Sequence, residues 1–223
     1  MATQTAPLAT MSANQVYLRG KRLLDLMFTL LILPLLCLVV VIVGIAIHLD
    51  SEGPIFFRQK RVGLNGEEFT MYKFRSMYAN GSDHIHQENI TRYINGEKLN
   101  TLTETNAYKL DRDPRITRVG HIIRKTSIDE LPQFFNVLRG EMSLVGPRPP
   151  IEYETRLYSQ HAWLRLSGKP GLTGPWQVYG RSCVPFNEMV EMDIAYLQRQ
   201  SLLEDLKLIV LTVPVMVFAR GGA

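Results

Sequence analysis

The chain has 223 residues, a length suited to one sizeable domain with an appendage, and 46% of them are hydrophobic. It shows no low-complexity bias and no internal repeat, which excludes repeat architectures, and its two cysteines exclude a disulfide framework. The net charge of +4 at pH 7 suits an anionic membrane surface or a phosphate-bearing substrate, and does not by itself indicate nucleic acid.

The chain opens with a small, polar segment, and we expect residues 1–18 to form a disordered tail. An almost continuous apolar run follows from Leu26 to Ile47, and at helical rise it can cross a hydrocarbon core of about 30 Å. A signal peptide is disfavoured, because residues 48–52 do not resemble a small-residue cleavage site. On hydropathy alone, a straight transmembrane helix is an even alternative.

Two features of this run favour a helix that enters a membrane, bends and returns. Pro34 lies inside the run, where it removes a backbone hydrogen bond and bends a helix. Basic residues flank both ends, with Arg19, Lys21 and Arg22 before the run and Arg58, Lys60 and Arg61 after it. Since positive charge marks the cytoplasmic side, both ends are assigned to that side. The alternative for Pro34 is that membrane helices tolerate proline.

A β-hairpin is expected after the apolar run. Its first strand covers residues 55–59, Asn65-Gly66 makes the turn, and the second strand covers residues 69–77. Lys73 and Arg75 alternate with Tyr72 and Phe74, so both cations lie on one face of the strand. That face is either solvated or a seat for phosphate, and the alternation alone favours a solvated face.

The most informative stretch runs from Arg124 to Pro149. It places an adjacent acidic pair, Asp129 and Glu130, between cations on both sides, with Arg148 in a rigid Gly-Pro-Arg-Pro turn. We expect a helix to start at Asp129 and to stop at Gly140, and a helix start is a natural seat for phosphate. On spacing alone the alternative is stronger: Ser127 and Glu130 form an ordinary capping box.

The segments outside this stretch are mostly helical in pattern. Helices are expected over residues 121–125, 153–167 and 187–200, and residues 206–218 form an apolar segment that Pro214 breaks, too short to span and suited to the membrane interface. Residues 169–181 form a Gly- and Pro-rich loop that carries Trp176, Tyr179 and Arg181. Such a set suits stacking on a base or sugar and binding a phosphate, or else a packed turn with Trp176 in the core.

Several of these pieces, in this order, resemble the bacterial sugar transferases, or monotopic phosphoglycosyl transferases. The resemblance runs from Lys21 to about Phe218. Its motifs are Lys21-Arg22 with Asp25, Gly53-Pro-Ile-Phe-Phe-Arg-Gln, Lys73-Phe-Arg-Ser-Met, Asp113-Pro-Arg-Ile-Thr, residues 124–136 and 142–149, and Lys169-Pro-Gly-Leu-Thr-Gly. The motif Gly174-Pro175-Trp176 departs from the Gly-Trp-Ala that is usual in relatives. The segment over residues 80–109 is longer than the corresponding segment of the smallest members.

The resemblance implies a reaction. Members transfer a sugar-1-phosphate from a UDP-sugar to a membrane polyprenol phosphate and release UMP, using Mg²⁺ at the cytoplasmic face of the bacterial inner membrane. By the same resemblance, Asp129 is the nucleophile and a metal contact, and Glu130 is its catalytic partner. The substrate-binding residues that it implies are Arg124, Arg148, Arg181, Lys73 and Arg75. It favours a hexose as the sugar and leaves a homodimer open.

The expected fold class is α+β. It comprises the tail, a proline-broken re-entrant membrane helix over residues 19–50, a small cytoplasmic α/β catalytic domain over residues 51–201 and an interfacial C-terminal helix over residues 202–223. Expected partners are the UDP-sugar, polyprenol phosphate and membrane phospholipids, and no nucleic acid. The alternative function is a non-catalytic membrane-anchored scaffold that binds anionic lipids. Such a scaffold does not need an acidic pair between arginines.

Overall fold

The computed structural model describes residues 15–78, 84–96, 113–180 and 184–218. Its helices and strands are α1 Gln15–Asp50, β1 Phe56–Val62, η1 Leu64–Gly66, β2 Glu68–Phe74, α2 His84–Ile94, α3 Arg118–Lys125, η2 Ile128–Gln133, α4 Phe134–Arg139, β3 Ser143–Val145, α5 Glu152–Thr155, α6 Gln160–Trp163, η3 Leu164–Ser167, β4 Gly171–Thr173, η4 Trp176–Gly180, α7 Phe186–Arg199 and α8 Leu202–Phe218. The mixture of helix and sheet expected from the sequence is confirmed.

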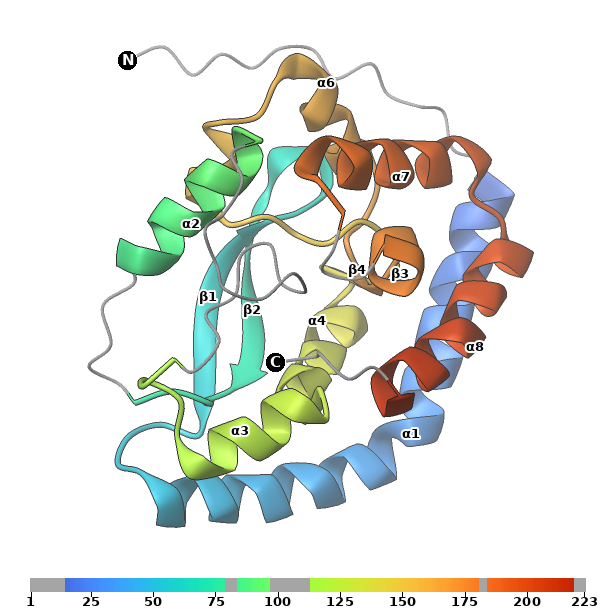
Figure 1. Ribbon diagram of the computed structural model, residues 1–223. Coiled ribbons are helices and arrows are strands. Elements are labelled where there is room, and N and C mark those ends of the chain that lie inside the picture. The colour runs from blue at the N-terminus through green and yellow to red at the C-terminus, as the bar shows by residue number, and fades with distance from the viewer. Residues whose placement is uncertain (1–14, 79–83, 97–112, 181–183, 219–223) are drawn as a thin grey trace.

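The long N-terminal helix α1 borders the rest of the molecule along two sides. It begins at Gln15, so the last residues assigned to the tail are helical, and the rest of the tail lies outside the described residues. Helical structure continues through Pro34, and Figure 1 shows α1 bending near its middle, from a first part beside α8 to a second part under α3. Within the described parts of the chain, α1 is the one helix long and apolar enough to cross a membrane.

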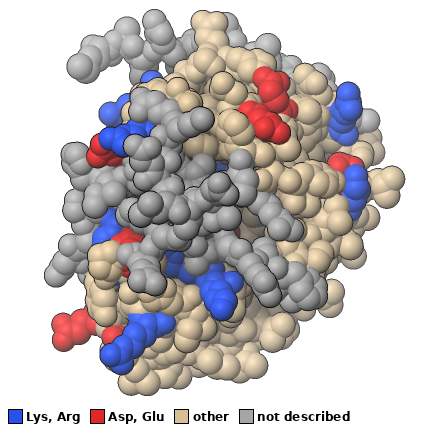
Figure 2. Space-filling view, viewed as in Figure 1, with Lys and Arg blue, Asp and Glu red and all other residues tan. Residues whose placement is uncertain are grey.

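The side of α1 that faces away from the domain is apolar and exposed. Exposed apolar side chains of α1 include Leu23, Met27, Leu30, Leu31, Leu35, Leu38, Val41, Ile42, Ile45 and Leu49. The neighbouring helix α8 adds Leu203, Leu206, Val210 and Val213. Figure 2 shows uncharged residues along the middle and right of the lower edge, where α1 runs in Figure 1, and charged residues of both signs at its left end. An exposed apolar surface of this extent marks contact with a membrane or a partner.

Buried polar contacts hold the start of α1 against the domain. Lys21 Nζ lies 2.8 Å from Asp205 Oδ2 at the start of α8, and the Tyr17 hydroxyl donates to the same oxygen at 2.9 Å. Asp25 accepts from Ser143 Oγ and from the backbone N–H of Leu144. Lys21 therefore binds α8, and Asp25 binds the first residues of β3.

The predicted hairpin is present, with slightly different bounds. β1 and β2 pair antiparallel from Phe56 opposite Phe74 to Val62 opposite Glu68, and the turn contains Asn65 and Gly66, both at positive φ. Arg61, taken from the sequence as part of a basic flank, is instead buried. It donates to the carbonyl oxygen of Pro149 at 3.0 Å and so ties β1 to the Gly-Pro-Arg-Pro turn.

A second, parallel pair of short strands holds that turn in place. β3 and β4 pair Ser143 with Gly171 and Val145 with Thr173. Gly146 donates its N–H to Thr173 O at 2.9 Å, and a Cβ at Gly146 would lie 2.3 Å from Lys169 O. Only glycine permits this close approach of the two backbones. The turn that carries Arg148 is thus fixed to the loop that leads to Trp176.

Two predicted helices differ from the structure. Residues 153–167 form three short pieces, α5, α6 and η3, and not one amphipathic helix. The C-terminal helix begins at Leu202 and runs through Pro214 without a break. Its buried Asp205 and Leu208 pack against the rest of the protein.

Candidate active site

The acidic pair lies in η2, a short 3₁₀ helix between α3 and α4. The expected single helix is therefore two segments, η2 and then α4, which ends at Gly140 with φ 82° as the glycine signal predicted. The capping-box interpretation is wrong, because Ser127 has φ 56° and its side chain makes no capping hydrogen bond. Glu130 is thereby available for a contact outside its own helix.

Glu130 makes that contact with the returning strand of the hairpin. Lys73 Nζ lies 2.6 Å from Glu130 Oε1, and the Lys73 side chain is only 17% exposed. The solvated face favoured by the strand alternation is therefore wrong for Lys73. A partly buried, charge-assisted contact of this kind fixes both side chains, so η2 and β2 hold the carboxylate and the ammonium group in a defined relation.

Lys73, Glu130 and Arg148 line one pocket, called the Lys73 pocket below. Gln133 and Gln177 add polar groups, and Met71, Pro149, Gly171 and Leu172 complete its walls. The pocket holds about 320 Å³ of space, part of it open to solvent. Asp129, the neighbour of Glu130 on η2, is partly buried and is not among the residues that line this pocket. Two cations beside the Glu130 carboxylate make a site that can bind a phosphate next to the η2 segment that carries Asp129.

Three other residues were predicted from the sequence to bind the substrate. Two of them do not line this pocket, and the third lies outside the described residues. Arg75 is buried and donates to the carbonyl oxygens of Ser51 and Glu52, just beyond the end of α1. Arg124 lies in the last turn of α3. Arg181 lies outside the described residues.

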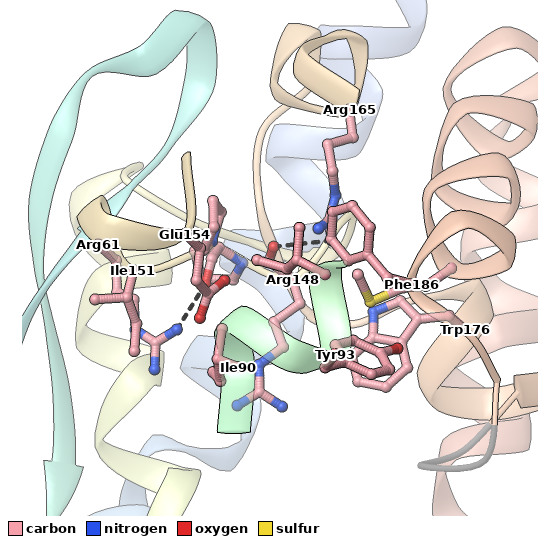
Figure 3. A pocket seen from close by; sticks show the side chains of 13 residues that line it. Arg61, Ile90, Tyr93, Arg148, Ile151, Glu154, Arg165, Trp176 and Phe186 are labelled. Carbon is pink, nitrogen blue, oxygen red and sulfur yellow. Dashed lines mark hydrogen bonds between the residues drawn. The ribbon is translucent and has the colours of Figure 1, made fainter. Parts of the chain in front are cut away.

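A second pocket adjoins the first, and we call it the Glu154 pocket (Figure 3). Arg148 and Pro149 line both pockets. The second encloses about 510 Å³, part of it open, between the hairpin, α2, α5 and α7. Its polar lining consists of Arg61, Arg148, Glu154, Arg165 and the indole of Trp176, and most of the remaining lining is apolar or aromatic. Burial raises the pKa of Glu154, and the three arginines oppose this rise.

A buried ion pair supports the wall shared by the two pockets. Arg165 Nη2 lies 2.6 Å from Asp193 Oδ2 on α7, and both side chains are almost fully buried. Arg165 also donates to the Tyr158 hydroxyl at 3.0 Å and to the carbonyl oxygen of Arg148 at 3.3 Å. Burial raises the pKa of Tyr158 to about 12, so it remains a neutral hydroxyl. Arg165 thus links α7 to the backbone of the Arg148 turn.

Trp176 follows the packing alternative for its loop. The side chain is 4% exposed and belongs to a core cluster with Phe186, Met189 and Ile194. The guanidinium carbon of Arg148 lies 5.9 Å from the centre of the indole ring, a cation–π distance. Of the two readings left open for Trp176, the structure follows core packing, and the indole stacks on the arginine that lines both pockets.

Sequence reasoning missed Arg61, Glu154, Arg165 and Gln177 as pocket residues. Arg61 and Arg165 are charged residues that became buried through contacts with distant segments, which no local pattern indicates. Glu154 lies in a segment predicted to be a helix, and Gln177 lies in a segment predicted to be a loop; neither prediction indicated a pocket. The Gly-Pro-Arg-Pro turn was the one local signal that pointed to this wall.

Mg²⁺ binding was expected at Asp129. No cluster of three His, Cys, Asp or Glu side chains that could hold a metal occurs among the described residues. Mg²⁺ usually keeps several waters and is bound by one or two carboxylates together with substrate phosphates. The adjacent carboxylates of Asp129 and Glu130, beside a pocket with phosphate-binding cations, fit that donor set.

Comparison with known proteins identifies the family of this chain. The family described as bacterial sugar transferase matches residues 16–219. Exopolysaccharide production protein ExoY of Sinorhizobium fredii is 40% identical over 203 residues, which cover 91% of this chain and 88% of ExoY. UDP-galactose-lipid carrier transferase of Erwinia amylovora is 42% identical over 203 residues, 91% of this chain and 41% of that protein.

Undecaprenyl-phosphate galactose phosphotransferase of Salmonella typhimurium is 39% identical over 203 residues, 91% of this chain and 41% of that protein. The chain therefore spans less than half the length of two of these relatives and most of the length of the third. Because the family match takes in nearly every residue from α1 to α8, this chain belongs to the bacterial sugar transferase family.

Proposed function

We propose that this protein transfers a sugar-1-phosphate from a UDP-sugar to a polyprenol phosphate, with release of UMP, as a membrane step of exopolysaccharide or related glycan synthesis. The observation that carries the proposal is the Lys73 pocket, where Lys73, Glu130 and Arg148 meet beside Asp129. The names of the relatives support the donor, the lipid acceptor and the pathway: one acts on UDP-galactose and a lipid carrier, one on undecaprenyl phosphate, and one serves exopolysaccharide production.

The reaction proceeds in two displacements at phosphorus. An Asp129 carboxylate oxygen attacks the phosphorus that bears the sugar; the bond to the bridging oxygen breaks, and UMP leaves with that oxygen. The polyprenol phosphate oxygen then attacks the same phosphorus, the Asp129–phosphorus bond breaks, and polyprenol diphosphate sugar forms. Two steps separate reactants that are both anionic and would repel each other in a direct transfer.

Charge neutralisation makes this chemistry feasible. A carboxylate is a poor nucleophile toward an anionic phosphate unless nearby cations stabilise the charge that develops. Lys73 and Arg148 supply positive charge in the pocket, and the Lys73 contact holds Glu130 in place next to the nucleophile. Mg²⁺, when held by Asp129 with Glu130 beside it, would add Lewis-acid stabilisation of the diphosphate.

The membrane arrangement also belongs to the proposal. We place α1 in the membrane as a re-entrant helix, with both ends at the cytoplasmic face of the inner membrane and α8 at the interface. Its exposed apolar side, the bend in Figure 1 and basic residues near both ends support this arrangement. A polyprenol acceptor remains in the bilayer, so its transferase must work at the membrane surface.

The experiment is a donor screen. Membranes containing the protein are incubated with polyprenol phosphate, Mg²⁺ and a panel of UDP-hexoses and UDP-N-acetylhexosamines, and UMP is measured. We expect UMP release with at least one UDP-hexose, dependent on the protein. If no UDP-sugar yields UMP above the level of membranes that carry Asp129→Asn, the transferase proposal fails and the lipid-binding scaffold takes its place.

A further inference from the structure

The Glu154 pocket can receive the part of the donor that extends beyond the diphosphate. Arg148 and Pro149 form a common wall between this pocket and the Lys73 pocket. A donor whose phosphates lie between Lys73 and Arg148 has one end within reach of the second pocket. Two groups of the donor compete for that place, the sugar and the uridine.

The apolar lining of the pocket favours the uridine. Tyr93, Ile151, Phe186 and Met189 contribute aromatic or aliphatic surface, and Ile90 on α2 lies close to Tyr93 in Figure 3. A pyrimidine has two apolar faces and polar groups only at its edge. A hexose carries hydroxyls around its ring, and each one buried here would need its own hydrogen-bond partner.

Two buried donors on residues that line the pocket, Arg165 Nε and Trp176 Nε1, have no partner among the described residues, and the indole is the one considered for a base. Trp176 is 4% exposed, and its Nε1 makes no hydrogen bond to any described residue. An indole N–H can only donate, and buried donors are nearly always paired in folded proteins. Trp176 lines the Glu154 pocket, so an acceptor on a bound molecule can complete its hydrogen bonding, and a carbonyl oxygen of uracil is such an acceptor.

An acceptor faces the same space. Figure 3 shows the Glu154 carboxyl group between Arg61 and Arg148. Burial raises the pKa of Glu154, and the charges of both arginines oppose this rise. Uracil carries an N–H donor at N3, flanked by two carbonyls, whereas cytosine carries an acceptor at N3. A carboxylate placed opposite N3 therefore accepts a hydrogen bond from uracil, whereas at the same place it meets the N3 lone pair of cytosine.

From these contacts we infer that the Glu154 pocket binds the uridine of the donor, with Glu154 accepting from N3–H and Trp176 Nε1 donating to a base carbonyl. This inference rests on the proposed function for the identity of the nucleotide. Glu154 and Trp176 are then the residues that select uridine over cytidine nucleotides, and the sugar lies on the other side of the Lys73 pocket.

The test compares UMP with CMP, which differ only at the base edge. Binding of each is measured by calorimetry to the full chain in lipid nanodiscs with Mg²⁺. The variants are Glu154→Gln and Trp176→Phe, which keep side-chain shape and remove the acceptor charge and the indole N–H. The matched control is Glu152→Gln on the same short helix, where Glu152 is exposed and paired with Arg156.

We expect the wild type and the control to prefer UMP by about tenfold or more, since one good hydrogen bond is worth about a factor of ten in Kd. Glu154→Gln should reduce that preference to near unity, and Trp176→Phe should weaken UMP binding by about tenfold. Equal binding of UMP and CMP by the wild type, or unchanged discrimination in both variants, would overturn the inference.

A second measurement uses the wild-type protein alone, so it does not depend on whether the variants fold. Wild-type protein is irradiated with 5-iodo-UMP, which cross-links to nearby aromatic side chains, and the labelled peptide is identified. Label on Tyr93, Trp176 or Phe186 supports the assignment, and label confined to other parts of the chain contradicts it. If the donor screen yields UMP while these results go against the pocket, only the pocket assignment fails. If the screen yields no UMP, the proposed function fails on its own.

Discussion

The ammonium group of Lys73 lies 2.6 Å from Glu130 Oε1, across residues that are 57 positions apart in the chain. This contact joins the returning strand of the hairpin to the acidic pair on η2. It gives the pair a fixed cation on one side, while Arg148 approaches the same pocket from the turn after β3. Covalent transfer at Asp129 depends on this convergence of two cations next to the acidic pair.

Replacing Lys73 by Met should lower the transfer rate by at least about 100-fold, in line with the loss of one preorganised charge at a site of developing negative charge. The assay is UMP release at saturating donor. The control is Lys60→Met, which removes the exposed partner of Glu68 on the same hairpin and should leave the rate within about twofold. Equal losses in the two variants would show that Lys73 acts only through hairpin stability.

Replacing Asp193 by Asn should destabilise the fold by about 3–5 kcal/mol, because it leaves the buried Arg165 guanidinium without its counter-ion. The free energy of unfolding is measured by urea denaturation in detergent. The control on the same helix is Glu191→Gln, which removes an exposed contact with His161 and should change stability by about 0.5 kcal/mol or less. A loss in the control as large as that in Asp193→Asn would contradict the role given to burial.

The Asp113 carboxylate should contribute to stability only above acidic pH. A hydrogen bond from Arg115 holds its pKa below the ordinary value of 3.8. Its contribution is therefore fully present above the unfolded-state pKa and is lost as pH falls through the lower folded-state pKa. Denaturation of wild type and Asp113→Asn at several pH values should show a gap in stability at pH 6 that narrows below about pH 4. A gap that stays constant over this range would rule out this source of stability.

Both ends of α1 should be on the cytoplasmic side. Single cysteines are placed at Gln15 and Glu52, both exposed at the ends of the helix, in a Cys37→Ala, Cys183→Ala background. A membrane-impermeant maleimide should label neither position in intact cells and both after the cells are opened. Labelling of the Gln15 position alone in intact cells would establish a single span. Pro34→Leu removes the cause of the bend and should shift part of the population toward that span.

Local signals in the sequence predicted the elements that local chemistry determines. The Asn65-Gly66 turn and the alternating residues around it predicted the hairpin, and Gly140 predicted the end of α4. The apolar run predicted α1. At the candidate site, the Asp129-Glu130 pair and Arg148 stood out because charged residues were concentrated around rigid prolines, and the structure brings Glu130 and Arg148 into one pocket.

Tertiary contacts decided the rest. Lys73 is shielded from solvent because η2 packs over its strand, which strand alternation cannot reveal. Arg75 and Arg61 look alike in sequence, yet one binds the carbonyls after α1 and the other lines the Glu154 pocket. Residues 153–167 have a helical pattern, but Arg165 must reach Asp193, Tyr158 and the Arg148 carbonyl together, and the segment forms three short pieces.

The measurement that tests the central claim most directly is intact mass spectrometry of the protein after brief incubation with its UDP-sugar and Mg²⁺, without any polyprenol phosphate. The account predicts a mass increase equal to one phosphosugar, release of an equal amount of UMP, and loss of the adduct when polyprenol phosphate is added. Asp129→Asn should show neither adduct nor UMP while retaining the unfolding transition of the wild type. An adduct of the same size on the Asp129→Asn protein, or UMP that appears only when acceptor is present and with no adduct under any quench, would contradict covalent transfer through Asp129.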